Sequence, residues 1–427
     1  MLFEELDLND NALDALEDMN FKTCTPVQER CIPEILAGHD VLGVAQTGTG
    51  KTAAYLLPIL SMLDDGGFPD DAINCVIMSP TRELAQQIDQ AMQGFAYYMP
   101  SVSSVAVYGG NDGSRYDREY KGMQLGADVI IATPGRLISH ITMGNVDFSR
   151  VSFFVLDEAD RMLDMGFYDD IMSIAKLLPE DCQVVMFSAT MPDKIEQLAG
   201  KLLKDPVMVK IAVSRPADKI RQKAYICNEN QKTGILRMLF ADDGAAVGSP
   251  LRCLLFSCSK QKVKEIARTL HKIGINCREM HSDLQQSQRD EVMHLFKSGK
   301  TDVLVATDIV ARGIDIDDIT LVINYDVPGD AEDYVHRIGR TARAQRDGVA
   351  ITLVCPKDFD RFMRIERFLK KAVDKIPVPS ELGEAPEYKT ERKHRGNGRP
   401  LRGGKGHRQK GRGGRPSPHD GRRKVRT

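Results

Sequence analysis

The chain has 427 residues, 42% hydrophobic and 28% charged, so it is long enough for two or three domains and too apolar to be wholly disordered. It contains no run of about 18 apolar residues, which excludes a membrane span, and no Cys-x-x-Cys pair among its nine cysteines, which argues against a zinc site or a disulfide framework. The formal net charge of −2 conceals an uneven distribution: residues 388–427 hold 15 Lys or Arg and two acids, a charge of +13, while the other 387 residues carry −15.

The chain begins with the acidic segment MLFEELDLND, which lacks the features of a secretory signal. Together with the scattered cysteines, this predicts a cytoplasmic protein with reduced thiols. Short apolar runs then recur through the first half, each followed by a polar loop and a helical pattern. We predict strands at 40–45, 74–80, 127–134, 152–160 and 183–190. Runs that are apolar on both faces are typical of strands buried between helical layers.

The second half repeats this alternation. We predict further strands at 252–259, 301–308, 320–326 and 348–355. A polar stretch around Pro216 predicts a linker at 213–220. The sequence therefore predicts an α/β fold with two domains, at 1–212 and 221–378, each a mostly parallel sheet flanked by helices. Residues 379–427 are predicted to be a disordered basic tail, because their Gly- and Arg-rich composition cannot bury enough apolar surface.

A glycine-rich loop follows the first predicted strand, and a helical pattern follows the loop. This is the setting of a P-loop, in which backbone N–H groups and the helix N-terminus bind phosphate groups. Lys51 would reach the β- and γ-phosphate oxygens, and the hydroxyl of Thr52 would bind Mg²⁺. The remaining residues of the predicted nucleotide site are Gln46, Thr47, Gly48, Thr49 and Gly50. Ala45 stands where the strict pattern has its first glycine.

The strand predicted at 152–160 ends in the acidic pair Asp157 and Glu158. A carboxylate at this position can hold Mg²⁺ opposite a P-loop, and we assign that role to Asp157. Glu158 would orient and deprotonate the attacking water. An Asp-Glu pair after a strand is often only the solvated start of a helix, but the P-loop in the same chain favours the catalytic interpretation.

With Ala159 and Asp160, the acidic pair reads Asp-Glu-Ala-Asp, and residues 1–375 resemble the DEAD-box family of RNA helicases in its bacterial form. The resemblance implies two RecA-like domains that close on ATP and single-stranded RNA. It also implies ATP and Mg²⁺ as cofactors, and an RNA-stimulated ATPase. Such an enzyme unwinds short RNA duplexes locally or remodels RNA–protein complexes.

Residues 21–28 resemble the Q motif of this family. An amide both donates and accepts hydrogen bonds, so Gln28 can pair with N6 and N7 of adenine, and Phe21 can stack on the base. The motif places Thr25 in the same nucleotide site. Asn20 departs from the family pattern, which usually has glycine before the aromatic residue.

Three segments of the first domain resemble the RNA-contacting loops of the family. They contain Arg82, the pair Gly109-Gly110, and Thr133 with Arg136. Glycine lets the backbone approach a phosphate closely, and Arg and Thr donate to phosphate oxygens. Ser188 and Thr190 resemble the motif that couples hydrolysis to RNA binding. We expect their hydroxyls to hydrogen-bond the carboxylates between Asp157 and Asp160.

The second domain has no P-loop, but its predicted strand ends carry charged residues. By the family resemblance, Thr307 lies near an RNA phosphate and Asp315 holds the ribose hydroxyls of ATP. Gln286 and Arg289 match a further pair on the RNA side. These residues extend both predicted sites across the two domains.

Residues 334–343 resemble the last motif of the family. Arg340 and Arg343 would act as arginine fingers that reach the γ-phosphate from across the cleft. His336 and Arg337 would couple the two domains. Ala342 stands where glycine is more usual, a change that should be tolerated.

The tail repeats Arg and Lys with Gly, as at 402–406 and 410–415. Such segments bind RNA by neutralising phosphates and by stacking guanidinium groups, with little sequence choice. RNA is therefore the predicted partner, bound through its backbone without sequence specificity. Ribosomal or RNA-decay complexes are further candidate partners. We expect a monomer without a membrane attachment.

Two other functions are compatible with these residues. One is a DNA helicase or duplex DNA translocase on the same fold, because no single residue proves that the 2′-hydroxyl of RNA is read. The other is an RNA clamp that binds without useful turnover. Lys51, Asp157, Glu158 and Arg340 argue against the clamp. ATPase rates with RNA, with DNA and without nucleic acid would separate the three functions.

Overall fold

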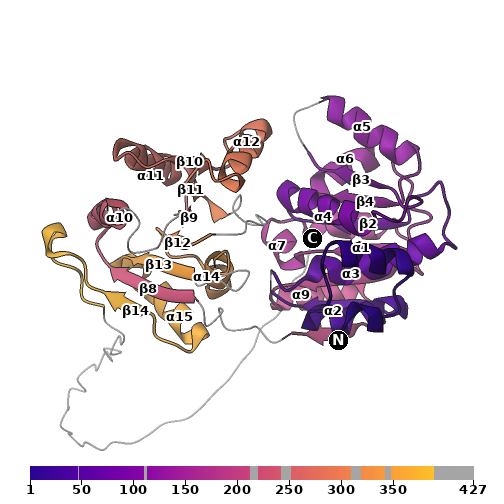
Figure 1. The fold of residues 1–427 in the computed structure, drawn as a ribbon, viewed down its shortest axis with the longest axis horizontal. Helices are drawn as coiled ribbons and strands as arrows, with labels where there is room; N and C mark the ends of the chain where they lie inside the picture. Colours follow the sequence, from indigo (N-terminus) through magenta and orange to yellow (C-terminus); the bar gives the residue numbers. More distant parts are fainter. Residues whose placement is uncertain are drawn as a thin grey trace, which may run out of the picture. The chain divides into compact units, whose positions relative to one another are not determined.

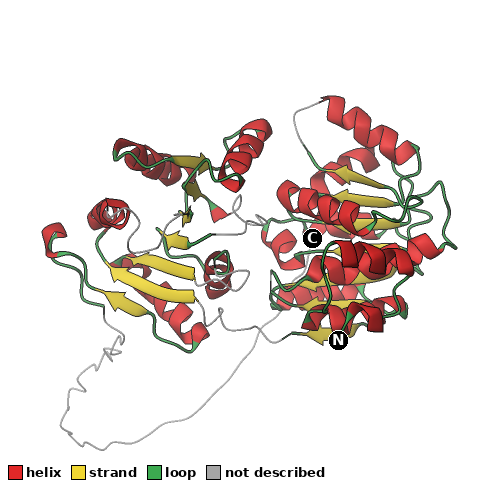
Figure 2. Cartoon of the chain, in the orientation of Figure 1, coloured by secondary structure: helices red, strands yellow, loops and turns green. Residues whose placement is uncertain are grey.

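The computed structural model describes residues 1–46, 48–109, 113–211, 220–241, 252–308, 319–341 and 348–388. Within these ranges the chain forms two seven-stranded sheets with helices on their faces (Figures 1 and 2). Every pairing between the named strands is parallel. The predicted α/β fold with two parallel sheets is confirmed.

The first sheet has the strand order β3-β4-β2-β5-β6-β1-β7. Its strands are β1 (Val41–Val44), β2 (Cys75–Met78), β3 (Ser104–Val107), β4 (Val129–Ala132), β5 (Phe153–Leu156), β6 (Gln183–Ser188) and β7 (Val207–Lys210). Its helices are α1 (Asp10–Asp18), α2 (Pro26–Leu36), α3 (Lys51–Asp65), α4 (Arg82–Phe95), α5 (Gly113–Gln124), α6 (Pro134–Thr142), α7 (Ala159–Asp164), α8 (Tyr168–Ala175) and α9 (Asp193–Leu202).

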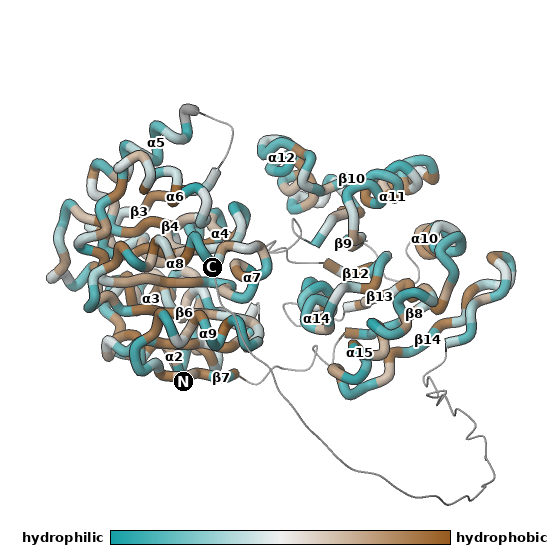
Figure 3. The backbone as a smooth tube through the Cα atoms, turned by 180° about the vertical axis from the view of Figure 1, so that it is seen from behind, coloured by the Kyte–Doolittle hydropathy of each residue, from teal (hydrophilic) through white to brown (hydrophobic). Residues whose placement is uncertain are grey.

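Alternate residues of these strands enter two separate cores. Helices α1 to α4 pack on one face, against side chains such as Val155 and Val185. Helices α6 to α9 pack on the other, against Phe154, Leu156 and Met186. Because both faces are covered, the central strands are apolar throughout, and Figure 3 shows the brown, hydrophobic segments concentrated at the strands.

The second sheet has the order β10-β11-β9-β12-β13-β8-β14. Its strands are β8 (Ile220–Ile226), β9 (Cys253–Phe256), β10 (Cys277–Met280), β11 (Val303–Ala306), β12 (Leu321–Asn324), β13 (Gly348–Val354) and β14 (Asp374–Ile376). Its helices include α10 (Lys232–Ala241), α11 (Lys260–Lys272), α12 (Gln286–Lys297), α14 (Ala331–Ile338) and α15 (Phe359–Leu369). Among the described helices, none combines the length and apolar character needed to cross a bilayer.

Two predicted boundaries differ from the structure. Ile220, expected in the linker, is the first residue of β8, because its side chain is buried and it pairs with Gly348 of β13. Residues 379–388, expected in the tail, pack on the second domain. The hydroxyl of Tyr388 hydrogen-bonds the carboxylate of Glu366 at 2.9 Å, and its ring lies 5.0 Å from that of Phe359. The rest of the predicted tail lies outside the described residues.

Candidate functional site

The P-loop lies between the carboxyl end of β1 and the start of α3. Gly48 and Gly50 have positive φ angles, +83° and +89°, and a side chain at Gly50 would also meet Gln28 at 2.5 Å. The first helical residue is Lys51, so the N–H groups of the first turn of α3 face the loop. Lys51 is 6% exposed, and within the described residues its ammonium makes no hydrogen bond. A buried ammonium in this state is unfavourable unless an anion binds beside it, which fits a phosphate group.

Gln28 connects the start of α2 to the P-loop. Its Nε2 donates to the carbonyl of Gly50 at 3.1 Å, and its Oε1 accepts from the N–H of Thr25 at 2.8 Å. An amide has two N–H groups and two oxygen lone pairs, so each end retains the capacity to pair with a base. Phe21 is 49% exposed, and its ring centroid is 6.4 Å from that of Phe95. An aromatic face is therefore accessible to a base.

Asp157 follows β5 and is almost fully buried. Its Oδ2 accepts a hydrogen bond from the hydroxyl of Tyr55 at 3.0 Å, and Tyr55 lies one turn after Thr52 on α3. The two residues predicted to hold Mg²⁺ thus share one neighbour. Burial raises the pKa of Asp157 to about 6; the charge of Lys51 opposes this shift and that of Glu158 adds to it. One hydroxyl and one carboxylate fit Mg²⁺, which completes its shell with phosphate and water oxygens.

The acidic pair continues into α7 through a strained residue. Glu158 has φ 51° and ψ 50°, a left-handed conformation that is uncommon outside glycine and asparagine. Asp160 accepts hydrogen bonds from the N–H of Thr190 at 3.2 Å and from its hydroxyl at 3.1 Å, as expected for that hydroxyl. The expectation for Ser188 is wrong: its hydroxyl donates to the carbonyl of Thr190 at 2.6 Å, because the loop after β6 turns back on itself.

Four of the residues assigned to RNA line one open cavity of about 460 Å³: Arg82, Thr133, Arg136 and Arg289. Arg82 is the first residue of α4, and Thr133 precedes the first residue of α6. Burial lowers the pKa of Arg82, and the nearby charge of Arg289 lowers it further. Gly109 lies so close to Arg82 that a side chain there would be 3.1 Å from the guanidinium. Crowded guanidinium groups favour an anionic ligand in the cavity.

Two other residues assigned to RNA are not among those that line this cavity. Thr307 follows β11 and is partly exposed. Gln286 is the first residue of α12, and its Oε1 accepts a hydrogen bond from Arg82 at 3.1 Å. Four predicted site residues lie outside the described residues: Thr47, Gly110, Asp315 and Arg343.

His336 lies on α14 and contacts α7. Its Nδ1 is 3.1 Å from Nη2 of Arg161, and Arg161 also lies 3.3 Å from the carboxylate of Asp333. A residue that couples two domains would make a contact of this kind. Arg340 follows α14 and is 5% exposed.

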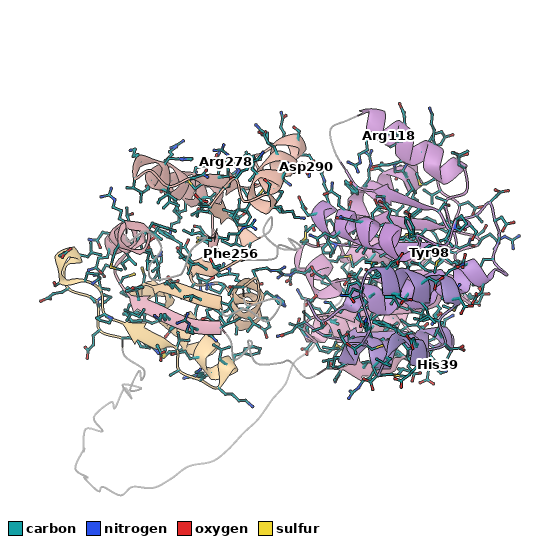
Figure 4. The ribbon with its side chains drawn as sticks, in the orientation of Figure 1. His39, Tyr98, Arg118, Phe256, Arg278 and Asp290 are labelled. Carbon is teal, nitrogen blue, oxygen red and sulfur yellow. The ribbon has the colours of Figure 1, made fainter. Side chains whose placement is uncertain are left out.

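Arg337, expected to couple the domains with His336, has a different environment. It is buried and forms a two-point ion pair with Asp308, at 2.6 and 2.7 Å. A third nitrogen donates to the side chain of Asn324 and to the carbonyl of Asp326. Its guanidinium lies 5.0 Å from the ring of Phe256, a residue labelled in Figure 4. These partners all belong to the second domain, so Arg337 stabilises that domain internally.

Tyr55 and Arg161 were not predicted from the sequence. Tyr55 comes three residues after Thr52, so it lies on nearly the same side of α3, and Arg161 directly follows the Asp-Glu-Ala-Asp motif. Their closeness in sequence to predicted site residues is the indication that the sequence offers for a role of Tyr55 and Arg161 in the site. The contacts themselves depend on how distant parts of the chain meet.

The fold and the site together define a P-loop protein built from two RecA-like domains. Residues 25–198 match the DEAD/DEAH box helicase model, and residues 232–345 match the helicase conserved C-terminal domain model. A DEAD-box ATP-dependent RNA helicase, CshA, of Geobacillus kaustophilus is 39% identical over 90% of this chain and 80% of its own length. The chain belongs to the DEAD-box family of helicases.

Other relatives are longer. The ATP-dependent RNA helicase DeaD of Haemophilus influenzae is 40% identical over 89% of this chain, which spans 60% of that protein. Among solved structures, Dbp5 of S. cerevisiae bound to RNA and ADP BeF3 has 30% identity and a TM-score of 0.79, covering 89% of this chain and 96% of that one. Mss116p bound to ssRNA and AMP-PNP has 28% identity and a TM-score of 0.78, covering 88% and 78%.

Proposed function

We propose that the chain is an ATP-dependent RNA helicase that hydrolyses ATP on closing around single-stranded RNA, and so unwinds short duplexes or remodels RNA–protein complexes. The observation that carries this proposal is the buried ammonium of Lys51, which makes no hydrogen bond in the described structure and stands at the start of α3, where the P-loop ends. A cation held in this way needs an anion such as the phosphate chain of ATP.

Each residue of the site has a chemical role in this proposal. Lys51 binds the β- and γ-phosphate oxygens, and Gln28 and Phe21 recognise adenine. Thr52 and Asp157 would hold Mg²⁺, which neutralises phosphate charge when bound. Glu158 orients the attacking water and accepts its proton, and Arg340 acts as the arginine finger together with Arg343.

RNA binds through its backbone in the cavity of Arg82 and Arg136, without sequence preference. Thr190 links this event to the acidic motif through its hydrogen bonds with Asp160. We propose a cytoplasmic location, because all nine cysteines are free, as a reducing compartment would leave them. A monomer is a separate part of the proposal and does not rest on the cysteines. RNA complexes of the related Dbp5 and Mss116p support RNA as the partner.

The test compares ATP hydrolysis with single-stranded RNA, with single-stranded DNA and without nucleic acid. We expect stimulation by RNA above both other conditions. Lys51→Ala should bind ATP at least about tenfold more weakly, because it removes the phosphate ligand. Glu158→Gln should bind ATP and RNA but lose turnover by about 10²-fold or more. Equal stimulation by DNA would refute RNA specificity, and unchanged ATP affinity of Lys51→Ala would refute the phosphate site.

A further inference from the structure

A buried polar cluster joins α5 to α6 beside the RNA cavity. At its centre is Glu119, which is 2% exposed. Its Oε2 accepts hydrogen bonds from Nε of Arg136 at 2.7 Å and from Nε2 of His140 at 3.0 Å, and Arg115 lies 3.5 Å from Oε1. The next residue along α5 towards its start, Arg118, is exposed (Figure 4). Glu119 is therefore directed into the domain, and it lies outside the segments that resemble family motifs.

The partners of Glu119 are themselves fixed. His140 is fully buried, and its Nδ1 lies 3.2 Å from the side-chain nitrogen of Asn145. An amide nitrogen can only donate, so Nδ1 accepts and Nε2 carries the hydrogen that is donated to Glu119. Asn145 also donates to the hydroxyl of Tyr116 at 2.8 Å. The rings of Tyr116 and His140 stack, with centroids 4.3 Å apart and planes 10° apart.

This arrangement constrains Arg136 from two directions. Glu119 binds its Nε, and the ring of Tyr116 lies 4.8 Å from its guanidinium carbon. Its side chain is 14% exposed, and within the described residues its buried Nη2 has no hydrogen-bond partner. Arg136 also lines the cavity assigned to RNA. A guanidinium held by its Nε edge can present the remaining N–H groups to a phosphate.

We propose that Glu119 is a positioning residue for RNA binding: it holds the guanidinium of Arg136 in the orientation in which the N–H groups that Glu119 does not bind meet a backbone phosphate. The inference rests on the proposed function, because Arg136 has a phosphate to meet only if RNA enters the cavity.

Glu119 has two effects on RNA binding, one of charge and one of conformational freedom, and they act in opposite directions. Its negative charge weakens the attraction of the cavity for RNA, whereas its hydrogen bond removes the rotamer freedom that Arg136 would otherwise lose on binding. The second effect dominates because the 2.7 Å contact is buried and charge-assisted. The sign of the change on neutralising Glu119 therefore distinguishes a positioning residue from a simple counter-ion.

The test compares Glu119→Gln with Asp117→Asn, which removes the same charge from an exposed site on the same helix. By charge alone, both variants should bind RNA more tightly. We expect Glu119→Gln to raise the RNA concentration for half-maximal ATPase by about tenfold, with the effect on this concentration rather than on the maximal rate. Asp117→Asn should leave it unchanged or lower it. Glu119→Gln protein that binds RNA as tightly as wild type, or more tightly, overturns the proposal.

Substitutions at Arg136 provide a second test, of which Arg136→Lys does not depend on the folding of Glu119→Gln. Arg136→Lys keeps the charge but loses the planar fork, so it should resemble Arg136→Ala. Adding Glu119→Gln to Arg136→Ala should weaken RNA binding no further, because no guanidinium remains to be positioned. Wild-type RNA affinity of Arg136→Lys overturns the positioning role. If RNA fails to stimulate the wild-type ATPase, the proposed function itself fails. If RNA stimulates wild type and Glu119→Gln with the same half-saturating RNA concentration, only the role of Glu119 is rejected.

Discussion

Asp157 occupies a position with two conflicting requirements. Its burial next to β5 disfavours the charged carboxylate and raises the pKa of Asp157 to about 6. Binding of Mg²⁺ requires the ionised form. The hydroxyl of Tyr55, which donates to the carboxylate at 3.0 Å, partly reconciles the two because it stabilises the charged state.

We therefore predict an acid limb in the ATPase. The value of kcat/KM for ATP reports groups of the free enzyme, so it should fall as the pH drops through about 6, where Asp157 becomes protonated. Tyr55→Phe removes the hydrogen bond to the charged form, so the limb should move to higher pH by about one unit. The measurement is the pH dependence of kcat/KM in both proteins. A limb that stays in place in Tyr55→Phe would belong to another group.

Asn20 shows why one departure from the family pattern is tolerated. The family usually has glycine at this position, and Asn20 has a φ of +59°. Asparagine adopts this left-handed conformation more readily than other residues with side chains. Its N–H also closes the end of α1 by donating to the carbonyl of Glu17 at 2.8 Å.

The conformation of Asn20 predicts opposite effects for two substitutions. Asn20→Gly should leave the free energy of unfolding unchanged or raise it slightly, because glycine adopts this φ without strain. Asn20→Val should lower it by about 1–2 kcal/mol, because a β-branched side chain clashes in the left-handed region. Urea unfolding of both variants measures the difference. Equal stability of the valine and glycine variants would show that the turn rearranges.

Local sequence patterns predicted the part of the site in which neighbouring residues act together, as in the P-loop and the acidic motif. Tyr55 and Glu119 could not be predicted in this way. The hydrogen bond between Tyr55 and Asp157 joins residues 102 positions apart, and that between Glu119 and Arg136 joins residues 17 apart on separate helices. A tyrosine or a glutamate on an amphipathic helix gives no indication of its partner until the sheet places the two elements together.

At the scale of elements, the strands that the sequence predicted are central ones. The edge strands β3, β7, β10 and β14 were missed, as was β8 beside one edge. Predicted strands such as β2 are buried along their whole length, whereas β7 and β14 alternate or are mainly exposed. An edge strand carries polar residues because one side meets solvent, so it lacks the continuous apolar run that identifies a buried strand.

The two sheets repeat one strand order, but the lysine at the equivalent position has a different environment in the second domain. In strand order, β8 corresponds to β1 and β12 corresponds to β5. Lys232 begins α10 as Lys51 begins α3, and Asp326 follows β12 as Asp157 follows β5. In the second domain, however, Lys232 and Asp326 form a direct salt bridge at 3.1 Å, so the buried ammonium has its own anion. Burial alone would raise the pKa of Asp326, but Lys232 and its hydrogen bonds hold it well below the usual range.

This salt bridge should contribute more to stability than a second one to the same oxygen. Lys232 is fully buried, whereas Lys262, 3.0 Å from the same Oδ1 of Asp326, is 28% exposed. Lys232→Met should lower the free energy of unfolding by about 3 kcal/mol, and Lys262→Met by less than about 1 kcal/mol.

The contribution of Asp326 has a definite pH dependence. Its folded-state pKa is depressed, so this stability is fully present above about pH 4, the ordinary range of an unfolded Asp, and is lost as the pH falls towards the folded-state pKa. Denaturant unfolding at pH 7 and at a series of pH values below about 4 measures both effects. Equal losses in the two lysine variants at pH 7 would show that burial does not set the strength of this network.

At the scale of the whole molecule, the charge is divided between residues 1–387 and the C-terminal segment. Residues 388–427 carry +13 and the other 387 carry −15. The structure moves the boundary of the packed body to Tyr388, whose hydroxyl and ring contact α15. A truncation that tests the basic segment alone must therefore retain Tyr388 and remove residues 389–427.

We predict that this truncation weakens RNA binding without altering the chemistry. The acidic body repels RNA at long range, and the basic segment, joined to the second domain, raises the local RNA concentration. The RNA concentration for half-maximal ATPase should therefore rise about tenfold or more at low salt, while the maximal rate at saturating RNA stays within about twofold of the wild-type value. The difference should shrink as salt increases, because counter-ion release drives this attraction.

Truncation after residue 378 is the matched control. It also removes the contacts of Tyr388, so it should lower the melting temperature, whereas truncation after residue 388 should not. An unchanged half-saturation point at low salt would exclude the basic segment as an RNA tether, and a lower maximal rate would instead show that it contributes to the catalytic domains.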